Sequence, residues 1–267
     1  MKIIRFLDEH DRQCYAHSYS DGNAILLEGD LLGELTDTGQ RVSVKKILAP
    51  LEPAAIFGIA LNYKQHADEA GFEKPKYPIL FFKNPASVNH PGDPIVIPEC
   101  CEDIPQVDWE AELAVVIGRA AKNVPASEAL QYVKGYSPTN DISARHWQKH
   151  AGAGQVARGK SFDTFCPLGP ELITADEIPD PQSLKLQCLL NGEIMQDSNT
   201  SQMIFSVAEI IAYLSMDTTL LPGSVILSGT PGGVGFARNP PVFLKSGDII
   251  EVAIEGMQTL SNPVVSV

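Results

Sequence analysis

The chain has 267 residues, 44% of them hydrophobic and 20% charged, which is ordinary for a folded protein with a sizeable core. Its 33 acidic and 20 basic residues give a formal net charge of −13 without a Lys/Arg cluster, which argues against nucleic acid or an anionic membrane as a partner. No apolar run is long enough to span a membrane, the N-terminus is not a secretory signal, and the five cysteines include no CxxC pair, so we expect a cytoplasmic protein with reduced thiols.

Residues 1–53 are predicted to form a small N-terminal domain rich in β-structure. Two short apolar runs, at 24–35 and 41–48, are broken by Gly and Asp, as in strands joined by tight turns. The segment 49–55, which contains two prolines, then has the composition of a linker. The remainder, 54–267, is predicted to be one larger domain.

The larger domain mixes strands and helices. Strands are predicted at 55–61, 78–84, 93–98, 108–118, 184–195, 224–230 and 248–257. Helices are predicted at 62–71, where Gly71 would end the helix, and at 203–215; a short helix opens 127–136 and leads into a strand, and 140–150 returns to helical composition. Because strands do not alternate regularly with helices, the pattern predicts an α+β fold dominated by β-structure rather than a doubly wound sheet.

The predicted strand "DWEAELAVVIG" at 108–118 carries an acidic residue at every second position near its start. Side chains two apart leave the same face of a strand, so Asp108, Glu110 and Glu112 are expected to crowd one side. A solvated sheet edge is the commoner reason for such acids, but the apolar residues that follow on both faces indicate burial, and buried charges need compensation. A hard cation such as magnesium is the simplest compensation, and Asp141, at a predicted strand-to-helix junction, offers a third oxygen.

Other segments carry side chains suited to acid–base or anion chemistry. His66 and Glu69 are three residues apart, on one face of the predicted helix, where a carboxylate can orient an imidazole as a general base; a solvated pair is the commoner interpretation. Lys160 follows a glycine in a loop-like stretch. The Gly-rich loop 228–235 either binds a carboxylate or phosphate through its amides or is a turn set by Pro231, and it lacks the ending of a nucleotide-binding P-loop.

Taken in order, these motifs and their neighbours resemble the fumarylacetoacetate hydrolase family. The motifs are "NYKQHADE", "FFKNPAS", "DWEAELAVVIG", "GYSPTNDISARHWQ", "GKSFDTFCPLGP", "NGEIMQ", "MIFSVAEIIAYLS" and "LSGTPGGVG". The resemblance covers roughly residues 54–267 and points to the bacterial acylpyruvase, oxaloacetate decarboxylase and 2-hydroxyhepta-2,4-diene-1,7-dioate isomerase branch, many of whose members carry a small N-terminal domain. It implies a mixed β-sheet roll and a homodimer.

The resemblance also assigns the metal and the base. It implies that Glu110, Glu112 and Asp141 bind Mg2+ or Mn2+. It implies that His66 and Glu69 form a water-activating dyad on a lid that orders over the substrate.

Further residues are assigned to the substrate by the same resemblance. The implied substrate contacts, of which the lysine is also catalytic, are Arg145, Gln148, Lys160 and Thr230. Asp108 has no ligand counterpart, so it is expected at the rim of the site or in hydrogen bonds behind the ligands. The connection 149–158 is longer than in compact acylpyruvase-type members, which leaves the details of the substrate pocket open.

By implication the chain is a divalent-metal-dependent hydrolase that cleaves a C–C bond in a 2,4-dioxo (acylpyruvate-like) acid through a metal-stabilised pyruvate enolate. The dyad would activate water for attack at the C4 carbonyl. Decarboxylation of an oxaloacetate-type acid and isomerisation of a 2-hydroxyhepta-2,4-diene-1,7-dioate-type acid on the same site are the alternatives, and a catalytically idle binding protein is the remote one. In each catalytic case the partner is a small anionic 2-oxo or 2,4-dioxo acid.

Overall fold

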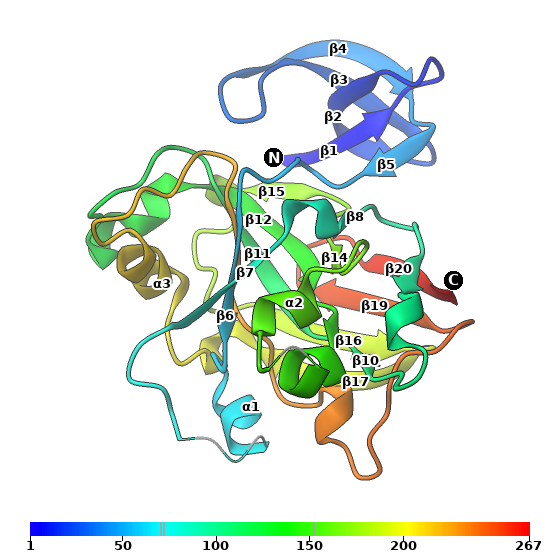
Figure 1. Cartoon of the computed structure of the whole chain (residues 1–267). Helices are drawn as coiled ribbons and strands as arrows, with labels where there is room; N and C mark the ends of the chain where they lie inside the picture. The colour runs from blue at the N-terminus through cyan, green and yellow to red at the C-terminus, as the bar shows by residue number, and fades with distance from the viewer. Residues whose placement is uncertain (70, 72, 152) are drawn as a thin grey trace.

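The computed structural model describes residues 1–69, 71, 73–151 and 153–267. Strands dominate it and form two large sheets, with short helices at their flanks (Figure 1). The predicted α+β fold dominated by β-structure is confirmed. Within these ranges no helix combines the length and the apolar character that crossing a membrane requires.

The first strands project from the body at the top of Figure 1. Their bounds are β1 Lys2–Leu7, β2 Gln13–Ser20, β3 Asn23–Gly29, β4 Leu35–Ser43 and β5 Lys46–Leu48. They enclose a small core of their own around Ile4 and Phe6, while Ile3, Leu27 and Leu31 pack against the body. Because β1 also pairs with β15 of the body, the sheet is continuous across the predicted domain boundary at residue 53, and that boundary stays a prediction.

The larger sheet has 11 strands, in the order β4-β3-β2-β1-β15-β12-β11-β18-β6-β7 with β5 beside β1. The strands from the body are β6 Ile56–Ala60, β7 Ile79–Lys83, β11 Ala111–Ile117, β12 Val133–Asn140, β15 Leu172–Thr174 and β18 Val225–Leu227. All residues of β11 are buried, because β12 and β18 flank it and side chains cover both of its faces. This burial explains its almost uninterrupted apolar sequence.

The second sheet has five strands, in the order β17-β16-β19-β20-β9, and two small two-stranded sheets complete the β-structure. The bounds are β8 Val88–Asn89, β9 Ile95–Ile97, β10 Val107–Asp108, β13 Ser143–Ala144, β14 Cys166–Pro167, β16 Lys185–Leu190, β17 Glu193–Asn199, β19 Ile249–Ile254 and β20 Leu260–Ser266. The main apolar core, which contains Leu113 and Val115 of the larger sheet, also takes in Leu186 and Val252 of this one.

The helices are short. The α-helices are α1 Lys64–Glu69, α2 Val156–Lys160 and α3 Val207–Leu214. The 3-10 and π-helical turns are η1 Pro85–Ser87, η2 Glu99–Cys101, η3 Ala126–Tyr132, η4 Trp147–Ala151, η5 Ala175–Glu177, η6 Thr200–Gln202 and η7 Gly235–Ala237. α3 begins with a capping box, in which the Ser206 side chain and the Glu209 side chain satisfy each other's backbone amides.

Four local predictions are wrong in detail. The predicted strand 184–195 is a hairpin, because β16 ends at Leu190 and β17 begins at Glu193. The predicted strand 108–118 is divided, because Asp108 belongs to β10, which pairs with β13, and β11 begins only at Ala111. The predicted helix 140–150 contains β13 and then the π-helical turn η4. Lys160 ends helix α2 rather than lying in a loop. The helix predicted at 62–71 is α1, which ends at Glu69, and residue 70 lies outside the described ranges.

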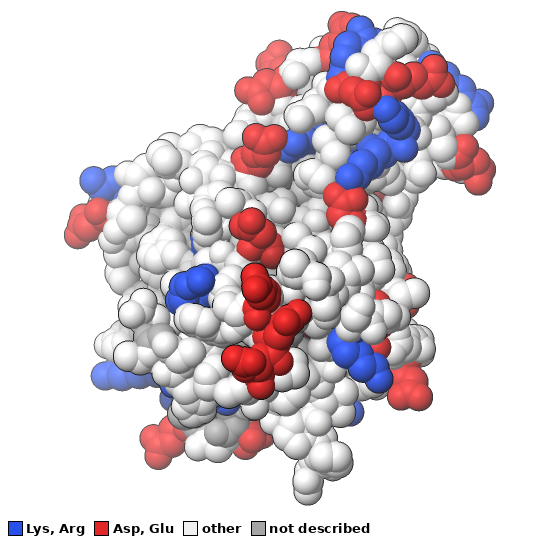
Figure 2. All heavy atoms as spheres, turned by 45° about the vertical axis from the view of Figure 1, so that its right-hand side comes forward, with Lys and Arg blue, Asp and Glu red and all other residues white. Residues whose placement is uncertain are grey.

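Acidic and basic side chains are interspersed over the N-terminal strands, and acidic ones gather lower down on the same face (Figure 2). No broad basic patch appears on this face of the described residues. The view accords with the excess of acidic residues in the sequence, and this face offers no surface suited to a polyanion.

Candidate active site

The three predicted metal ligands meet because β11 and β12 are antiparallel neighbours. The register pairs Ala111 with Asn140, so Glu110 and Asp141 lie opposite each other just beyond the paired residues, and the Asp141 amide donates to the Glu110 carbonyl at 2.8 Å. Glu112 follows two residues after Glu110, on the same side of the chain. Carboxylate oxygens from the three residues all lie within 4.8 Å of one another, and all three residues are buried.

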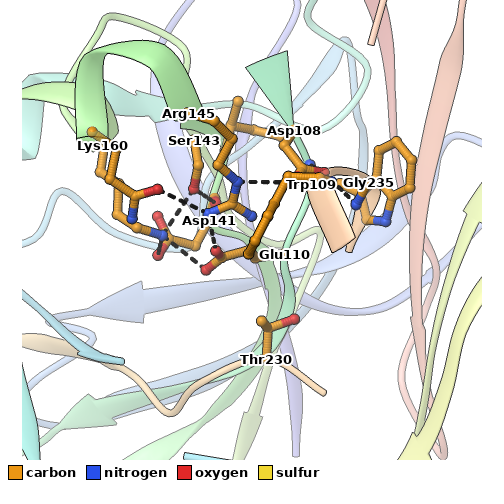
Figure 3. A network of polar contacts seen from close by, with 12 residues as sticks. Asp108, Trp109, Glu110, Asp141, Ser143, Arg145, Lys160, Thr230 and Gly235 are labelled. Carbon is orange, nitrogen blue, oxygen red and sulfur yellow. Dashed lines mark hydrogen bonds and ion pairs between the residues drawn. The ribbon is translucent and has the colours of Figure 1, made fainter. Parts of the chain in front are cut away.

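Two buried lysines bind these carboxylates. Lys160 Nζ donates to Glu110 Oε2 at 2.8 Å, to Asp141 Oδ2 at 2.5 Å and to the Ser143 hydroxyl at 2.8 Å (Figure 3). Lys83 Nζ, at the end of β7, donates to the other oxygen of Asp141 at 2.6 Å. Both lysines are at most 2% exposed, so each ion pair lies out of reach of bulk water. We call the three carboxylates, Glu110, Glu112 and Asp141, together with the three cations, Lys83, Lys160 and Arg145, the carboxylate–cation floor.

Asp108 connects Arg145 to the Gly-rich loop. Arg145 donates through Nε to Asp108 at 2.8 Å and through Nη1 to Glu110 at 2.7 Å, and the backbone amides of Gly235 and Phe236 donate to the two oxygens of Asp108 at 2.7 and 3.0 Å (Figure 3). Asp108 is completely buried. Its expected place at the rim is therefore excluded, and the alternative, hydrogen bonds behind the ligands, is what the structure shows.

Glu112 is the least compensated carboxylate of the floor. It accepts a hydrogen bond from the Gly229 amide at 2.6 Å, and within the described part of the chain no ion pair joins it to a lysine or arginine. Burial, and then the charges of Asp141 and Glu110, raise its pKa well above the ordinary value. Burial acts in the same sense on Glu110, but Lys160 and Arg145 outweigh it and the pKa of Glu110 is lowered.

The donor set fits a hard divalent cation. With Asp108, four buried carboxylates face three buried cations, which leaves one negative charge uncompensated. A divalent ion would relieve the repulsion that raises the pKa of Glu112 and would give the floor a net positive charge. Oxygens on opposite sides of an octahedral magnesium are ~4.2 Å apart, so oxygens already within 4.8 Å need only a small adjustment. These residues therefore fit Mg2+ or Mn2+.

A cavity of about 370 Å3 opens onto the floor. Its polar lining comes from His66, Glu110, Arg145, Gln148, Lys149, Lys160 and Thr230. Its other walls are mainly apolar and come from Ile59, Ala60, Leu61, Phe81, Val156 and Phe236. A water-poor cavity with a few convergent polar groups is typical of a small-molecule site.

α1 brings His66 to this cavity but leaves Glu69 outside it. His66 is 7% exposed, and its Nδ1 has no hydrogen-bond partner in the described residues. Burial lowers the pKa of His66, which keeps the imidazole neutral as a general base requires. The exposed Glu69 carboxylate instead accepts a hydrogen bond from the Gly233 amide at 2.9 Å. The two members of the predicted dyad are thus not hydrogen-bonded to each other in this structure.

The predicted substrate contacts line the cavity together. Arg145 Nη1 donates to Gln148 Oε1 at 3.1 Å, while its buried Nη2 has no partner in the described residues. A guanidinium with an unused donor suits a carboxylate ligand. Gly159 allows Lys160 to reach the floor, since a Cβ there would lie 2.6 Å from the backbone nitrogen of Gln148 and push α2 away from η4.

The Gly-rich loop uses three of its glycine amides within the protein. Gly229 donates to Glu112, Gly233 donates to the side chain at the end of α1, and Gly235 donates to Asp108. The Thr230 hydroxyl lines the cavity and accepts a hydrogen bond from Gln196 at 2.8 Å. These three amides are therefore not available to bind an anionic ligand.

Sequence reasoning missed Lys83 as a member of the floor and Phe236 as a wall. A signal for Lys83 was present, because "PILFFKN" ends an apolar strand in a lysine, and a lysine that such a strand buries requires an acidic partner. No local pattern marks Phe236, since its position depends on the hydrogen bonds of its loop to Asp108.

Comparisons with known proteins agree with the motifs. The family model described as "Fumarylacetoacetate (FAA) hydrolase C-terminal" matches residues 55–265. The mitochondrial oxaloacetate tautomerase fahd2 of Xenopus laevis is 48% identical over 220 residues, which are 82% of this chain and 68% of that protein. The mitochondrial oxaloacetate tautomerase Fahd2a of Rattus norvegicus is 47% identical over 219 residues, 82% of this chain and 69% of that protein.

Solved structures of similar fold cover the whole chain. The 5-carboxymethyl-2-hydroxymuconate delta-isomerase of Mycobacterium smegmatis is 34% identical with a TM-score of 0.86, and the match covers 100% of both chains. The fumarylacetoacetate hydrolase of Exiguobacterium antarcticum is 34% identical with a TM-score of 0.88, again over 100% of both chains. The similar proteins are thus named for a tautomerisation, an isomerisation and a hydrolysis.

Proposed function

The chain belongs to the fumarylacetoacetate hydrolase family, and from this premise we propose that it is a metal-dependent enzyme that moves a proton at C3 of a small anionic 2-oxo acid, as in keto–enol tautomerisation. The observation that carries the proposal is His66, a buried imidazole of lowered pKa that faces the same cavity as the floor without a hydrogen bond to Glu69. A base that transfers one proton needs no partner carboxylate. The relatives named oxaloacetate tautomerases support the same reaction.

The floor supplies the positive potential that the substrate needs. Arg145 would bind the C1 carboxylate through the Nη2 donor that the protein leaves unpaired. A divalent cation held by Glu110, Glu112 and Asp141 would add a Lewis acid that stabilises negative charge on the 2-oxo oxygen. The apolar walls of the cavity exclude water and so strengthen each of these interactions.

His66 and Lys160 have different roles in the proton transfer. Neutral His66 accepts the C3 proton as the enolate forms, and the enolate oxygen takes a proton from solvent to give the enol; both transfers run backward in the reverse direction. Burial acts to lower the pKa of Lys160, but Asp141 and Glu110 outweigh burial and raise it, so its ammonium remains charged. Because its three donors are engaged by Glu110, Asp141 and Ser143, it would stabilise the oxygen on which charge develops through its positive charge.

C–C hydrolysis of a 2,4-dioxo acid, the first expectation from the sequence, is the second candidate. One observation favours it: Glu69 lies one helical turn after His66, and the hydrogen bond that holds it to Gly233 is exposed. A rotation of Glu69 from Gly233 toward His66 would assemble the dyad that activates water. Decarboxylation and dienedioate isomerisation would rely on the same stabilisation of an enolate.

A panel of three assays on metal-loaded protein tests the proposal. The assays follow enol decay of oxaloacetate by absorbance, pyruvate release from acetylpyruvate, and CO2 release from oxaloacetate, each against a blank of metal without protein. We expect oxaloacetate tautomerisation to be fastest and to be lost with EDTA. Faster pyruvate release from acetylpyruvate would favour hydrolysis instead, and turnover of neither acid would reject the proposed function.

A further inference from the structure

Four cationic side chains line or support the cavity, and Lys149 differs from the other three. Lys83, Arg145 and Lys160 are buried, and each forms ion pairs with carboxylates of the floor. Lys149, on the π-helical turn η4, is exposed and borders the cavity, and no ion pair joins it to a carboxylate of the described residues. Its charge is therefore available to a ligand.

An aromatic ring positions Lys149. Its Nζ lies 3.7 Å from the centre of the Phe236 ring, a distance typical of a cation–π contact, and the Arg145 guanidinium lies 4.5 Å from the same ring. The Phe236 amide donates to Asp108, which also binds Arg145. One buried carboxylate thus orients the ring and the guanidinium beside which Lys149 lies.

The positive charges of Lys149 and Arg145 repel each other. Partial burial and then the charge of Arg145 lower the pKa of Lys149, and Asp108 opposes this effect. An anionic group beside Lys149 would offset this repulsion and gain an interaction with the free ammonium. The nearby walls are apolar, from Leu61, Val156 and Phe236, so a carboxylate bound there would lose water and would need a charged partner.

We infer that Lys149 determines specificity for a second carboxylate, at the end of the substrate remote from the floor. The inference rests on the proposed function and narrows its substrate class to 2-oxo dicarboxylic acids. The floor binds the 2-oxo acid end, and Lys149 at the mouth recognises the far carboxylate. A monocarboxylic 2-oxo acid leaves Lys149 without a partner and gains nothing from it.

Oxaloacetate and its C4 methyl ester are a matched pair for the test, since the ester removes the charge of the far carboxylate and adds only a methyl group. We expect the wild-type protein to prefer the diacid in kcat/KM by about 10- to 150-fold, the range that one charge-assisted hydrogen bond gives. Lys149→Met should abolish most of this preference, chiefly through a higher KM for the diacid, and leave the ester nearly unchanged. Lys149→Arg should restore much of the preference. Lys122→Met, which removes an exposed lysine that does not line the cavity, is the matched control.

Calorimetric titration of the same two ligands into metal-loaded protein separates this inference from the proposed function, because it measures binding whichever reaction follows. Loss of the diacid preference in Lys149→Met without turnover by the wild type would retain the inference and reject the function. Equal binding of diacid and ester by the wild type would overturn the inference. So would a Lys149→Met protein that keeps the preference, or one that loses affinity for both ligands alike.

Discussion

The floor of the cavity and its mouth place ionisable side chains in opposite environments. At the floor, Lys160 lies between the carboxylates of Glu110 and Asp141, Lys83 pairs with Asp141, and every one of these side chains is buried. At the mouth, His66 and Lys149 border the same cavity without an ion pair in the described residues.

The scaffolds of the two regions differ as well. Strand pairing in the centre of the larger sheet places the acids of the floor, whereas the short helix α1 and the turn η4 place the mouth. A substitution at the floor should therefore alter both the stability of the fold and the rate of the reaction. A change at the mouth should alter the reaction or its selectivity while the fold persists.

The largest effect is expected from Glu110→Gln, which removes a metal ligand while it preserves the shape of the side chain. Turnover should fall by about 10³-fold or more, because a Lewis acid contributes several kcal/mol to the transition state. Steady-state kinetics at saturating Mg2+ measures the loss, and circular dichroism checks the fold. Near-normal turnover of this variant, or of EDTA-treated wild type, would disprove the metal assignment.

Lys83→Met tests whether the floor also carries stability. Removal of this cation leaves Asp141 with one fewer partner in a dry environment, and the free energy of unfolding should fall by about 3–5 kcal/mol. Lys45→Met is the control, because Lys45 forms an exposed ion pair with Asp11, and such pairs contribute ~0–1 kcal/mol. Urea denaturation of both variants measures the difference. Similar losses of unfolding free energy in the two variants would mean that the buried Lys83 contributes no more to stability than an exposed lysine.

Substitutions on α1 distinguish the transfer of a single proton by His66 from the activation of water by the His66–Glu69 dyad. His66→Ala should lower tautomerisation by about 100-fold, the lower end of what a general base contributes, while Glu69→Ala should change it only a few-fold. The kinetics of both single variants and the double variant give the answer. Equal losses in all three would show that the pair acts as a unit, which is the behaviour expected of the hydrolytic dyad.

The smallest effect on the active site is expected from a substitution on the exposed face of β7. This edge strand alternates, with Phe81 and Lys83 facing inward and Leu80 and Phe82 exposed at 40% and 51%. The predicted homodimer stays a prediction, and an exposed apolar edge strand is a suitable contact for a second copy. Light scattering at micromolar concentration should give a dimeric mass for the wild type and a lower mass for Phe82→Glu. Ile194→Glu, which changes an exposed apolar residue of β17, is the control. A monomeric wild type would refute the prediction.

Several features follow from the sequence alone because their causes are local. The alternation of a β-strand puts Glu110 and Glu112 on one side of the chain, and the apolar residues after them indicate burial. The i,i+3 spacing places His66 and Glu69 on one face of a helix.

The cytoplasmic location that the composition indicates stays a prediction. The oxaloacetate tautomerases of Xenopus laevis and Rattus norvegicus are named mitochondrial.

Only the tertiary structure decided which charges meet. Lys83 binds Asp141 across 58 positions of sequence, and Asp108 binds Arg145 across 37. Local periodicity predicts which face a side chain occupies, but partners this far apart depend on strand order and on the close packing of α2 against η4. The same holds for Glu69, whose spacing pairs it with His66 while a loop from a distant part of the chain offers it the Gly233 amide. Burial makes each unpaired charge costly, so the folded arrangement, rather than the spacing of residues, selects the partners.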